Sequence, residues 1–254
     1  MKLKMQMIIN TTGLVIYSRI QGEANRSIDV LSPEYGAINI SVRGGMKLTG
    51  SNAAATQLFA YSKFCIRIDK GRYYLDSSKV IRIFYELRND IKSYTLACYL
   101  ADICRYTGTA NQTAYDVSRL MLNSLHYLCS GEKSCDLIKS IFELRFMADT
   151  GYIPNVIGCA ECFKYDGDDI YLLIKEGKLL CSKHFKGNED EYHVRLSPIL
   201  LHTIRFIVLC DLERVFNFRI SDKVQNELSP VAEKYFLEHI PDKYFPCLDY
   251  YHTL

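Results

Sequence analysis

Alternating apolar and polar positions dominate the first 80 residues of the chain. Short runs rich in β-branched and aromatic residues are separated by turn signals that contain glycine or proline. These runs predict five strands, at Thr11–Ile20, Arg26–Leu31, Ile38–Val42, Phe59–Asp69 and Arg72–Leu75. Five short strands in so few residues are typical of a small closed barrel. Residues 46–56 are predicted to form a loop or a short helix at its rim.

The apolar period becomes helical after the two serines at 77 and 78. Val80, Ile83, Leu87 and Ile91 recur at helical spacing, and a further helix is predicted at Tyr94–Tyr106. Three cap signals predict later helix starts: Asn111 before Val117–Leu128, Ser134 before Leu137–Asp149, and Ser197-Pro198 before Ile199–Leu212. Ser229-Pro230 predicts the start of a last helix that ends near Ile240.

Four residues between the fourth and fifth helices have the spacing of metal ligands. Cys159 and Cys162 form one pair, and Cys181 and His184 form a second pair after 18 intervening residues. Two short pairs joined by a β-hairpin are what a tetrahedral zinc ion needs, and three Cys with one His make a closed structural site. The other interpretation is four ordinary buried residues, because cysteine often behaves as a small core hydrophobe. His193 is a weaker candidate for the fourth ligand.

Together these patterns predict a multi-domain β + α fold. We expect an N-terminal five-stranded barrel of the OB type (oligonucleotide-binding), a helical domain and an inserted Cys3His zinc ribbon. The expected boundaries are 1–78 for the barrel, 79–155 for the helical domain, 156–190 for the zinc ribbon and 191–254 for C-terminal helices that pack with the helical domain.

Composition indicates a globular protein of a reducing compartment. Apolar residues make up 48% of the chain and charged residues 24%, and no run is long enough for a membrane span or a cleavable signal. The ten cysteines are dispersed and show no disulfide framework. We therefore expect a cytoplasmic protein that does not bind membranes.

Charge is divided unevenly along the chain. Residues 1–80 carry 11 Lys and Arg against 5 Asp and Glu, whereas the remainder carries 20 against 24. A basic first third predicts that a polyanion binds the barrel, although uneven solvated charge gives the same count. Tyrosines and Phe64 are interleaved with these cations, as in grooves that stack single-stranded bases. The candidate DNA-binding residues are Arg19, Arg26, Arg43, Lys47, Lys63, Arg67, Lys70 and Arg72.

Enzymatic motifs do not emerge from the sequence. Gly45–Gly50 has the outline of a phosphate loop, but Ser51-Asn52 stands where Lys followed by Ser or Thr is required. A zinc deaminase needs an open coordination position, which four protein ligands do not leave. We therefore expect a binding protein without a catalytic residue.

Several segments resemble the RecO family of bacterial recombination mediators. The segments are Gly13–Ile16 with Gly22-Glu23, Tyr35–Gly44, Phe84–Arg88, and Phe142–Arg145 with Gly151–Pro154 running into Cys159–Cys162. The resemblance implies an OB barrel, a helical domain and a zinc ribbon. It implies a role in DNA repair and recombination after DNA damage, through binding of single- and double-stranded DNA and annealing without ATP. It also implies contact with the acidic C-terminal tail of single-strand binding protein, action with RecR to replace that protein by recombinase, and a place in the bacterial nucleoid.

The chain departs from the family pattern at three places. Asn25 stands where many relatives carry Asp, His184 stands where the fourth ligand is often Cys, and residues 45–50 are less basic than the usual rim loop. The last difference predicts weaker DNA binding through that loop. Two other hypotheses remain: a zinc-stabilised scaffold for protein interactions, and an RNA-binding factor without annealing activity.

Overall fold

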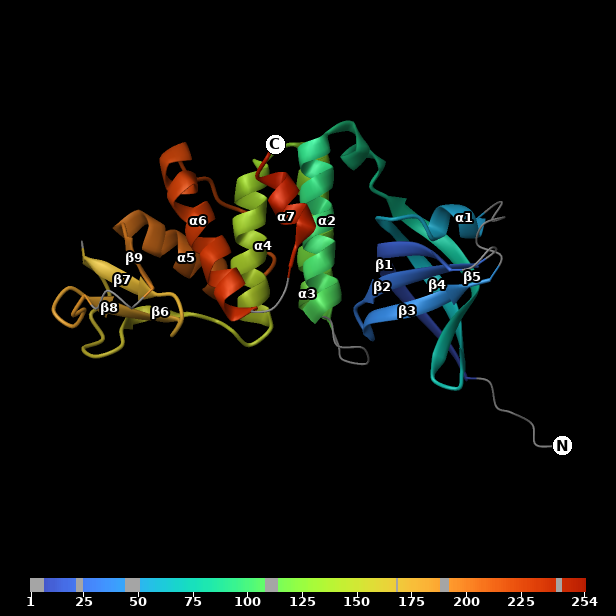
Figure 1. Ribbon diagram of the computed structural model, residues 1–254, viewed down its shortest axis with the longest axis horizontal. Coiled ribbons are helices and arrows are strands. Elements are labelled where there is room, and N and C mark those ends of the chain that lie inside the picture. Colours follow the sequence, from blue (N-terminus) through green and yellow to red (C-terminus); the bar gives the residue numbers. More distant parts are fainter. Residues whose placement is uncertain are drawn as a thin grey trace. The chain divides into compact units, whose positions relative to one another are not determined.

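The computed structural model describes two compact units. It covers residues 7–21, 25–43, 51–107, 114–167, 169–187, 192–240 and 244–254, with the backbone alone at positions 51, 106 and 107. Unit 1 comprises residues 1–132 and 245–254, and unit 2 comprises residues 133–244. Each unit is described separately below (Figure 1).

Unit 1 contains a five-stranded barrel. Its strands are β1 (Met7–Gln21), β2 (Asn25–Ser32), β3 (Gly36–Val42), β4 (Ala60–Asp69) and β5 (Arg72–Ile83), and a short helix α1 (Ser51–Ala55) precedes β4. The order β1-β2-β3-β5-β4 closes on itself because β1 also pairs with β4, and the parallel link between β3 and β5 rests on two paired positions. The predicted five-stranded OB-type barrel is therefore confirmed.

Alternation along the strands builds the barrel core. Apolar side chains such as Val15, Ile28, Ile40 and Ile66 are fully buried, and the residues between them face outward. Phe64 belongs to this core and is 1% exposed, so its ring offers no face for a base, contrary to the sequence interpretation.

The barrel extends further than the sequence pattern predicts. Residues 80–83 continue β5 instead of starting a helix, with Lys63 opposite Lys79 and Ala60 opposite Ile83. The β-branched Val80, Ile81 and Ile83 suit a pleated sheet, and pairing with β4 outweighs their apparent helical spacing. A single 3-10 turn, η2 (Tyr85–Asn89), follows the strand.

Besides α1, the described part of unit 1 contains three α-helices. They are α2 (Ile91–Thr107), α3 (Tyr115–Ser130) and the C-terminal α7 (Pro246–Tyr251). Both α2 and α3 contact β1 and β2, and α7 packs on α2 with Phe245 edge-on to Tyr99 at 5.4 Å between ring centroids. The predicted cap Asn111 lies outside the described residues, and α3 instead begins after Ala114 without a side-chain cap.

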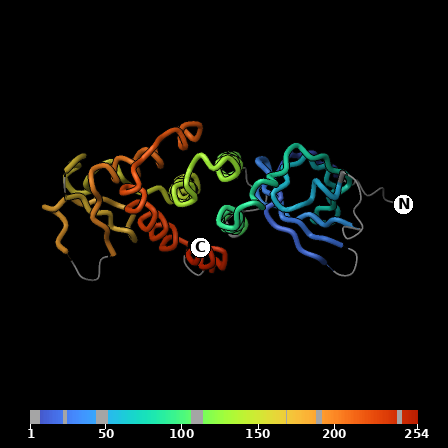
Figure 2. Tube along the Cα trace, turned by 90° about the horizontal axis from the view of Figure 1, so that it is seen from above, coloured from blue at the N-terminus to red at the C-terminus, as the bar shows by residue number. Residues whose placement is uncertain are grey.

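In its described residues, unit 2 combines a small sheet with three helices. The sheet contains β6 (Asn155–Cys159), β7 (Ile170–Leu173), β8 (Lys178–Cys181) and β9 (His193–Leu196) in the order β6-β8-β7-β9. The helices are α4 (Cys135–Asp149), α5 (Pro198–Leu209) and α6 (Asp222–His239). Figure 2 shows α6 running beside α4, in agreement with the close packing of these two helices. The predicted caps Ser134 and Ser197 are confirmed, since each hydroxyl accepts a hydrogen bond from the backbone three residues later.

The start predicted for the last long helix is wrong. Helix α6 begins after Ser221, whose hydroxyl accepts from the Val224 N–H, and Pro230 lies inside the helix. Proline lacks the N–H that would bond four residues back, so it usually marks a helix start. Here the Ser221 cap and burial of Leu228, Val231 and Phe236 stabilise the helix on both sides of the proline.

The helices expected in one helical domain fall into both units. Helices α2 and α3 belong to unit 1 and α4 to unit 2, while α7 returns to unit 1. The four-part division at residues 78, 155 and 190 stays a prediction. Among the described residues, no helix is both long and apolar enough to cross a membrane.

Candidate functional site

The four predicted metal ligands come together in unit 2. Cys159 ends β6, Cys162 lies in the following turn, Cys181 ends β8 and His184 lies in the next turn. One ligand atom from each residue lies within 4.8 Å of all the others. The sequence spacing therefore predicted a cluster of four groups that is able to hold a metal ion.

Strand pairing and tight turns position these side chains. The hairpin of β7 and β8 turns at Gly177, whose φ is +62°, and Ala160 of the first turn donates its N–H to Leu179 of β8 at 2.8 Å. Gly158 is required before the first turn, because a Cβ there would lie 2.9 Å from the Phe163 carbonyl oxygen. The pairing of β6 with β8 thus brings the two turns that carry the ligands together.

The distances between ligand atoms suit a tetrahedron. The Cys162 and Cys181 sulfurs are 3.8 Å apart, and the His184 Nδ1 lies 3.3 Å from the Cys181 Sγ and 3.6 Å from the Cys159 Sγ. Zinc bonds of about 2.3 Å to sulfur and about 2.0 Å to nitrogen imply edges of about 3.8 Å and about 3.5 Å. Four protein ligands fill such a site and leave no position for a substrate.

The environment of Cys159 favours the thiolate that a metal requires. Burial raises its pKa, but hydrogen bonds from the backbone of Cys181, Cys162 and Glu161, and from His184, lower it to about 6. The pKa of His184 is raised through its bonds to Cys181 and Cys159. His193 is outside the cluster, since its ring packs against Phe185 at 4.4 Å and Tyr171 at 5.9 Å between centroids.

Arg205 of α5 supports the segments on both sides of the first ligand pair. Its side chain is buried, and it donates to the carbonyls of Val156 at 2.6 Å and Ile157 at 2.9 Å, and to the carbonyl of Tyr165. Its guanidinium also lies over the Tyr165 ring at 3.8 Å. Sequence reasoning missed this residue because an arginine inside an apolar helix carries no spacing signal.

Replacing Arg205 with methionine is expected to destabilise unit 2. The variant leaves several backbone carbonyls without a donor, and each such loss costs about 1–3 kcal/mol when the group is buried. Arg195→Met is the matched control, because Arg195 forms an exposed ion pair with Asp169, a type worth under about 1 kcal/mol. Denaturant unfolding measures both, and equal midpoints would contradict this role for Arg205.

The predicted DNA-binding residues lie on several parts of the barrel. The structure brings Arg43 and Arg67 together, with each guanidinium 5.1 Å from the centroid of the Tyr74 ring. Exposed Lys63 lies further along β4. Lys70 and Arg72 flank Gly71 in the turn from β4 to β5 and are also exposed.

The other candidate residues lie on β1 and β2 or outside the described residues. Arg19 is exposed near the end of β1, and Arg26 is half-buried in β2 opposite Ile20. Lys47 lies outside the described residues. Among the aromatic residues, Tyr17 is covered by Arg105 of α2, whose guanidinium lies 3.6 Å from the ring centroid.

Two exposed cations of β5 were missed by the sequence interpretation. Lys79 lies directly opposite Lys63, and Arg82 lies opposite Tyr61. They were missed because residues after 78 were assigned to a helix. The run from Lys79 to Ile83, in which three of five residues are β-branched, was the signal for a longer strand.

Two family models and several known proteins match this chain over most of its length. Residues 5–84 match the model for the N-terminal part of Recombination protein O, and residues 88–246 match the model for its C-terminal part. The DNA repair protein RecO of Acetivibrio thermocellus is 32% identical over 97% of both chains. The RecO proteins of Alkaliphilus metalliredigens and Caldicellulosiruptor bescii are 24% and 25% identical, over 96% of this chain and 98% of theirs. With both halves matched and such coverage, the chain belongs to the Recombination protein O family.

Proposed function

We propose that this protein is a DNA repair and recombination mediator that binds single- and double-stranded DNA. It anneals complementary strands without ATP and acts with RecR to replace single-strand binding protein by recombinase. Membership of the Recombination protein O family supports the repair role. The observation that carries DNA binding is the pair Arg43 and Arg67, whose guanidiniums both lie against Tyr74 on the barrel.

Annealing requires strands that are held by their phosphates while their bases stay free to pair. Arginines stacked on a tyrosine are pre-oriented, so less side-chain entropy is lost when they contact phosphate. Such contacts carry no sequence information and weaken with salt. The protein acts by binding strands and exchanging partners, without a catalytic residue.

A zinc ion bound by Cys159, Cys162, Cys181 and His184 serves a structural role in this proposal. The donor set of three thiolates and one imidazole supports zinc over a hard cation, since thiolates suit soft or borderline metals. Bound zinc supplies folding energy by joining the two turns that carry the ligand pairs.

The partners follow from the family resemblance. RecR and the acidic tail of single-strand binding protein are proposed as partners, and the bacterial nucleoid in the cytoplasm as the place of action. No residue is assigned to either protein contact.

Annealing of two complementary single strands tests the proposal. We expect the protein to accelerate annealing without ATP on bare strands and on strands coated with single-strand binding protein, with the rate falling steeply as salt rises. Fluorescence energy transfer between end-labelled strands measures the rate.

The controls separate the other hypotheses. DNA binding without annealing would contradict the mediator role, and no binding of any oligonucleotide at moderate salt would favour an interaction scaffold. Tighter binding of RNA than of DNA of equal length would favour an RNA-binding factor.

A further inference from the structure

The outer face of the β4–β5 ribbon carries a series of cross-strand pairs, with register shifts between Tyr61 and Ser62 and between Cys65 and Ile66. The pairing register places Arg67 opposite Tyr74, Cys65 opposite Ser77, Lys63 opposite Lys79, and Tyr61 opposite Arg82. Residues 62, 64 and 66 of β4 are buried, so the alternate residues 61, 63, 65 and 67 face outward. Cations therefore occur at three of four successive pairs along one face, and one of them, Arg67, also forms an ion pair with Asp76 of β5 at 3.4 Å.

Lys63 and Lys79 form the centre of this series. Both are exposed, and like charges directly opposite each other destabilise a sheet. Within the described part of the chain, no carboxylate forms an ion pair with either ammonium group. An anion bound between them would relieve their repulsion.

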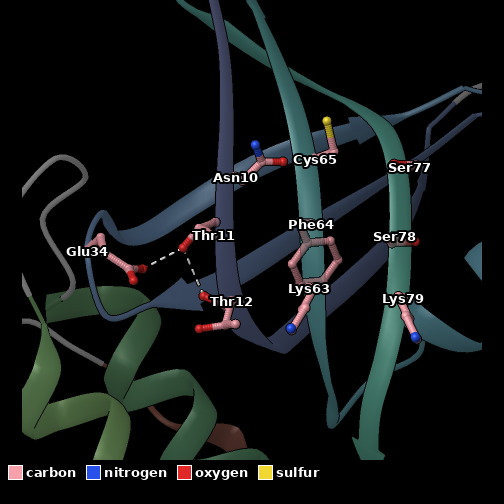
Figure 3. A pocket seen from close by; sticks show the side chains of 10 residues that line it. All are labelled: Asn10, Thr11, Thr12, Glu34, Lys63, Phe64, Cys65, Ser77, Ser78 and Lys79. Atoms are coloured by element: carbon pink, nitrogen blue, oxygen red, sulfur yellow. Dashed lines mark hydrogen bonds between the residues drawn. The ribbon is translucent and has the colours of Figure 1, made fainter.

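A groove of about 540 Å³ lies at the same place and is lined by polar groups. Figure 3 shows Lys63 and Lys79 on adjacent strands, with Thr12 of β1 beside Lys63. The only acidic side chain among the lining residues is Glu34, and its carboxylate accepts hydrogen bonds from the hydroxyls of Thr11 and Ser32. Hydroxyl and ammonium donors of this kind suit phosphate oxygens.

The series has a length that suits several nucleotides. On β4 successive pairs are two residues apart, roughly 7 Å, so the Arg67 and Tyr61 pairs are about 20 Å apart along that strand. On β5 the register shifts add one residue at two of the three steps. One aromatic ring lies at the Arg67 end, where the Tyr74 ring centroid is 5.1 Å from the guanidinium, whereas Phe84, 4.5 Å from the Arg82 guanidinium, is 4% exposed and offers no face for a base. Phosphate contacts with flanking aromatic groups are characteristic of single-strand binding grooves.

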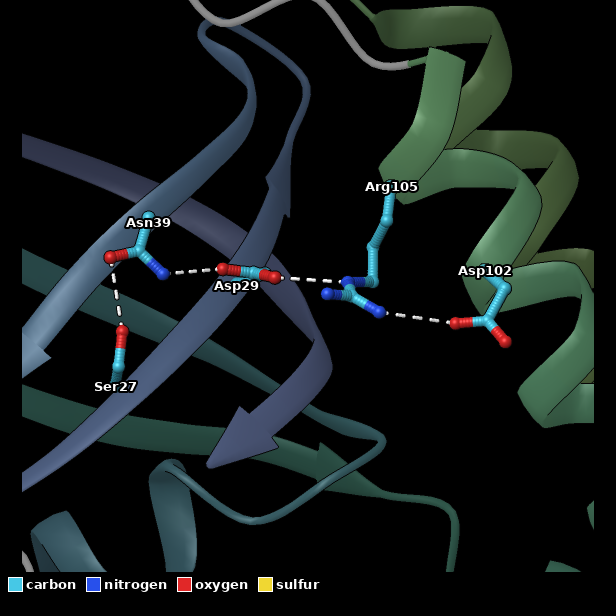
Figure 4. A network of polar contacts seen from close by, with 5 residues as sticks. All are labelled: Ser27, Asp29, Asn39, Asp102 and Arg105. Atoms are coloured by element: carbon cyan, nitrogen blue, oxygen red, sulfur yellow. Dashed lines mark hydrogen bonds and ion pairs between the residues drawn. The ribbon is translucent and has the colours of Figure 1, made fainter. Parts of the chain in front are cut away.

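OB barrels commonly bind oligonucleotides on the side formed by β2 and β3. In unit 1 this side carries a network of ion pairs and hydrogen bonds to α2. Asp29 of β2 pairs with Arg105 of α2 at 2.9 Å and accepts from Asn39 of β3, while Arg105 also pairs with Asp102 (Figure 4). The packing of α2 on β2, with Arg105 held by Asp29, leaves less of this side open to a phosphate backbone.

We propose that a single DNA strand binds along the outer face of β4 and β5, with its phosphates on the cationic track formed by Arg67, Lys63, Lys79 and Arg82. This inference rests on the proposed DNA-binding function and adds the path of the strand. The path follows β4 and β5. It includes Lys79 and Arg82, which were not among the candidate residues selected from the sequence.

Removing the positive charges of the track tests the proposed path. We expect the triple variant Lys63→Gln/Lys79→Gln/Arg82→Gln to bind a labelled oligothymidylate on the order of 100-fold more weakly at about 0.1 M salt, because three phosphate contacts are lost. The slope of log affinity against log salt should fall by about 2, at roughly 0.7 per phosphate on a single strand. Fluorescence anisotropy across a salt series measures both quantities.

The matched control removes lysine charge from unit 2. Lys175→Gln/Lys223→Gln replaces two exposed lysines and should leave affinity and slope near wild type. If the triple variant binds DNA as tightly as this control, the proposed path of the strand is wrong, but the proposed DNA-binding function is not contradicted. If the wild-type protein binds no DNA, the proposed function fails, and the track fails with it.

Thiol labelling gives a second readout on the unaltered protein. Cys65 lines the groove between the Arg67 and Lys63 pairs, so a bound strand should slow its alkylation several-fold. Cys135 at the start of α4 in unit 2 serves as the reference thiol. Peptide mass spectrometry follows both residues, and unchanged labelling of Cys65 at saturating oligonucleotide would overturn the proposed path.

Discussion

Serine in place of Cys181 is expected to leave the purified protein with well under one zinc per chain and to unfold the sheet of unit 2. Cys181 is 1% exposed, ends β8 and lies close to two other ligands, at 3.8 Å from the Cys162 Sγ and 3.3 Å from the His184 Nδ1. A hydroxyl is a poor zinc ligand, so the variant loses one of four bonds and the remaining site opens.

The expected effect is large because the metal joins two turns at the edge of a small sheet. Structural zinc contributes on the order of 10 kcal/mol to the folding of small zinc-binding modules. The sheet that holds the ligands is small, since β7, β8 and β9 have four residues each. Strands this short have little independent stability.

Two variants control this experiment. Cys135→Ser makes the same chemical change in unit 2 outside the cluster and should retain one zinc per chain. His184→Cys converts the site to four cysteines, which zinc accepts equally well, and should also retain the metal. Elemental analysis and thermal unfolding are the measurements. A Cys181→Ser protein with full zinc content and wild-type stability would rule out the proposed site.

The ligand cluster was predictable because its signal is local. Cys159-x-x-Cys162 and Cys181-x-x-His184 need only a hairpin between them, and the apolar runs on either side of Gly177 supply one. The caps Ser134 and Ser197 were predictable for the same reason, since a cap depends on residues within one helical turn.

The errors arise where distant contacts decide the structure. Residues 80–83 are strand because β4 pairs with them, although their apolar spacing also fits a helix. Helix α6 continues through Pro230 because its buried side chains pack within unit 2. Such packing overrides local propensity, and a single sequence does not display it.

The DNA-binding surface was only partly predictable. The excess of basic residues in the first third pointed to the barrel, but charge counts do not show which face is open. That choice depends on α2, whose Arg105 pairs with Asp29 across 76 positions of sequence. It also depends on strand register, which places Lys79 opposite Lys63 and buries Phe64 beside it.

The second large effect on stability is expected at a buried charge cluster between α4 and α6. The Lys139 Nζ lies 3.0 Å from the Glu143 carboxylate of its own helix and 2.7 Å from the Glu233 carboxylate of α6. Lys139 and Glu143 are both 0% exposed. Burial lowers the pKa of Lys139, but attraction to the two glutamates more than offsets this and leaves its pKa above the ordinary value.

Lys139 is therefore charged at neutral pH and neutralises part of the charge on two carboxylates. Folding raises the pKa of Lys139. Its contribution to stability is therefore fully present at pH values below the ordinary lysine pKa of about 10.4, and it is lost as the pH rises through the pKa of the folded state. Removing the ammonium group leaves Glu143 buried without this cation.

Lys139→Met is accordingly expected to lower the free energy of unfolding of unit 2 by about 3–5 kcal/mol, the usual cost of breaking a buried ion pair from one side. The double variant Lys139→Met/Glu143→Leu should recover most of this loss, because two apolar side chains of similar volume need no counter-charge. Urea unfolding at neutral pH measures the wild type, both single variants and the double variant. If the double variant is less stable than Lys139→Met, packing at this position outweighs charge burial and the electrostatic explanation is wrong. Recovery in the double variant would instead show that the cluster stabilises α4 against α6 only as a complete set of charges.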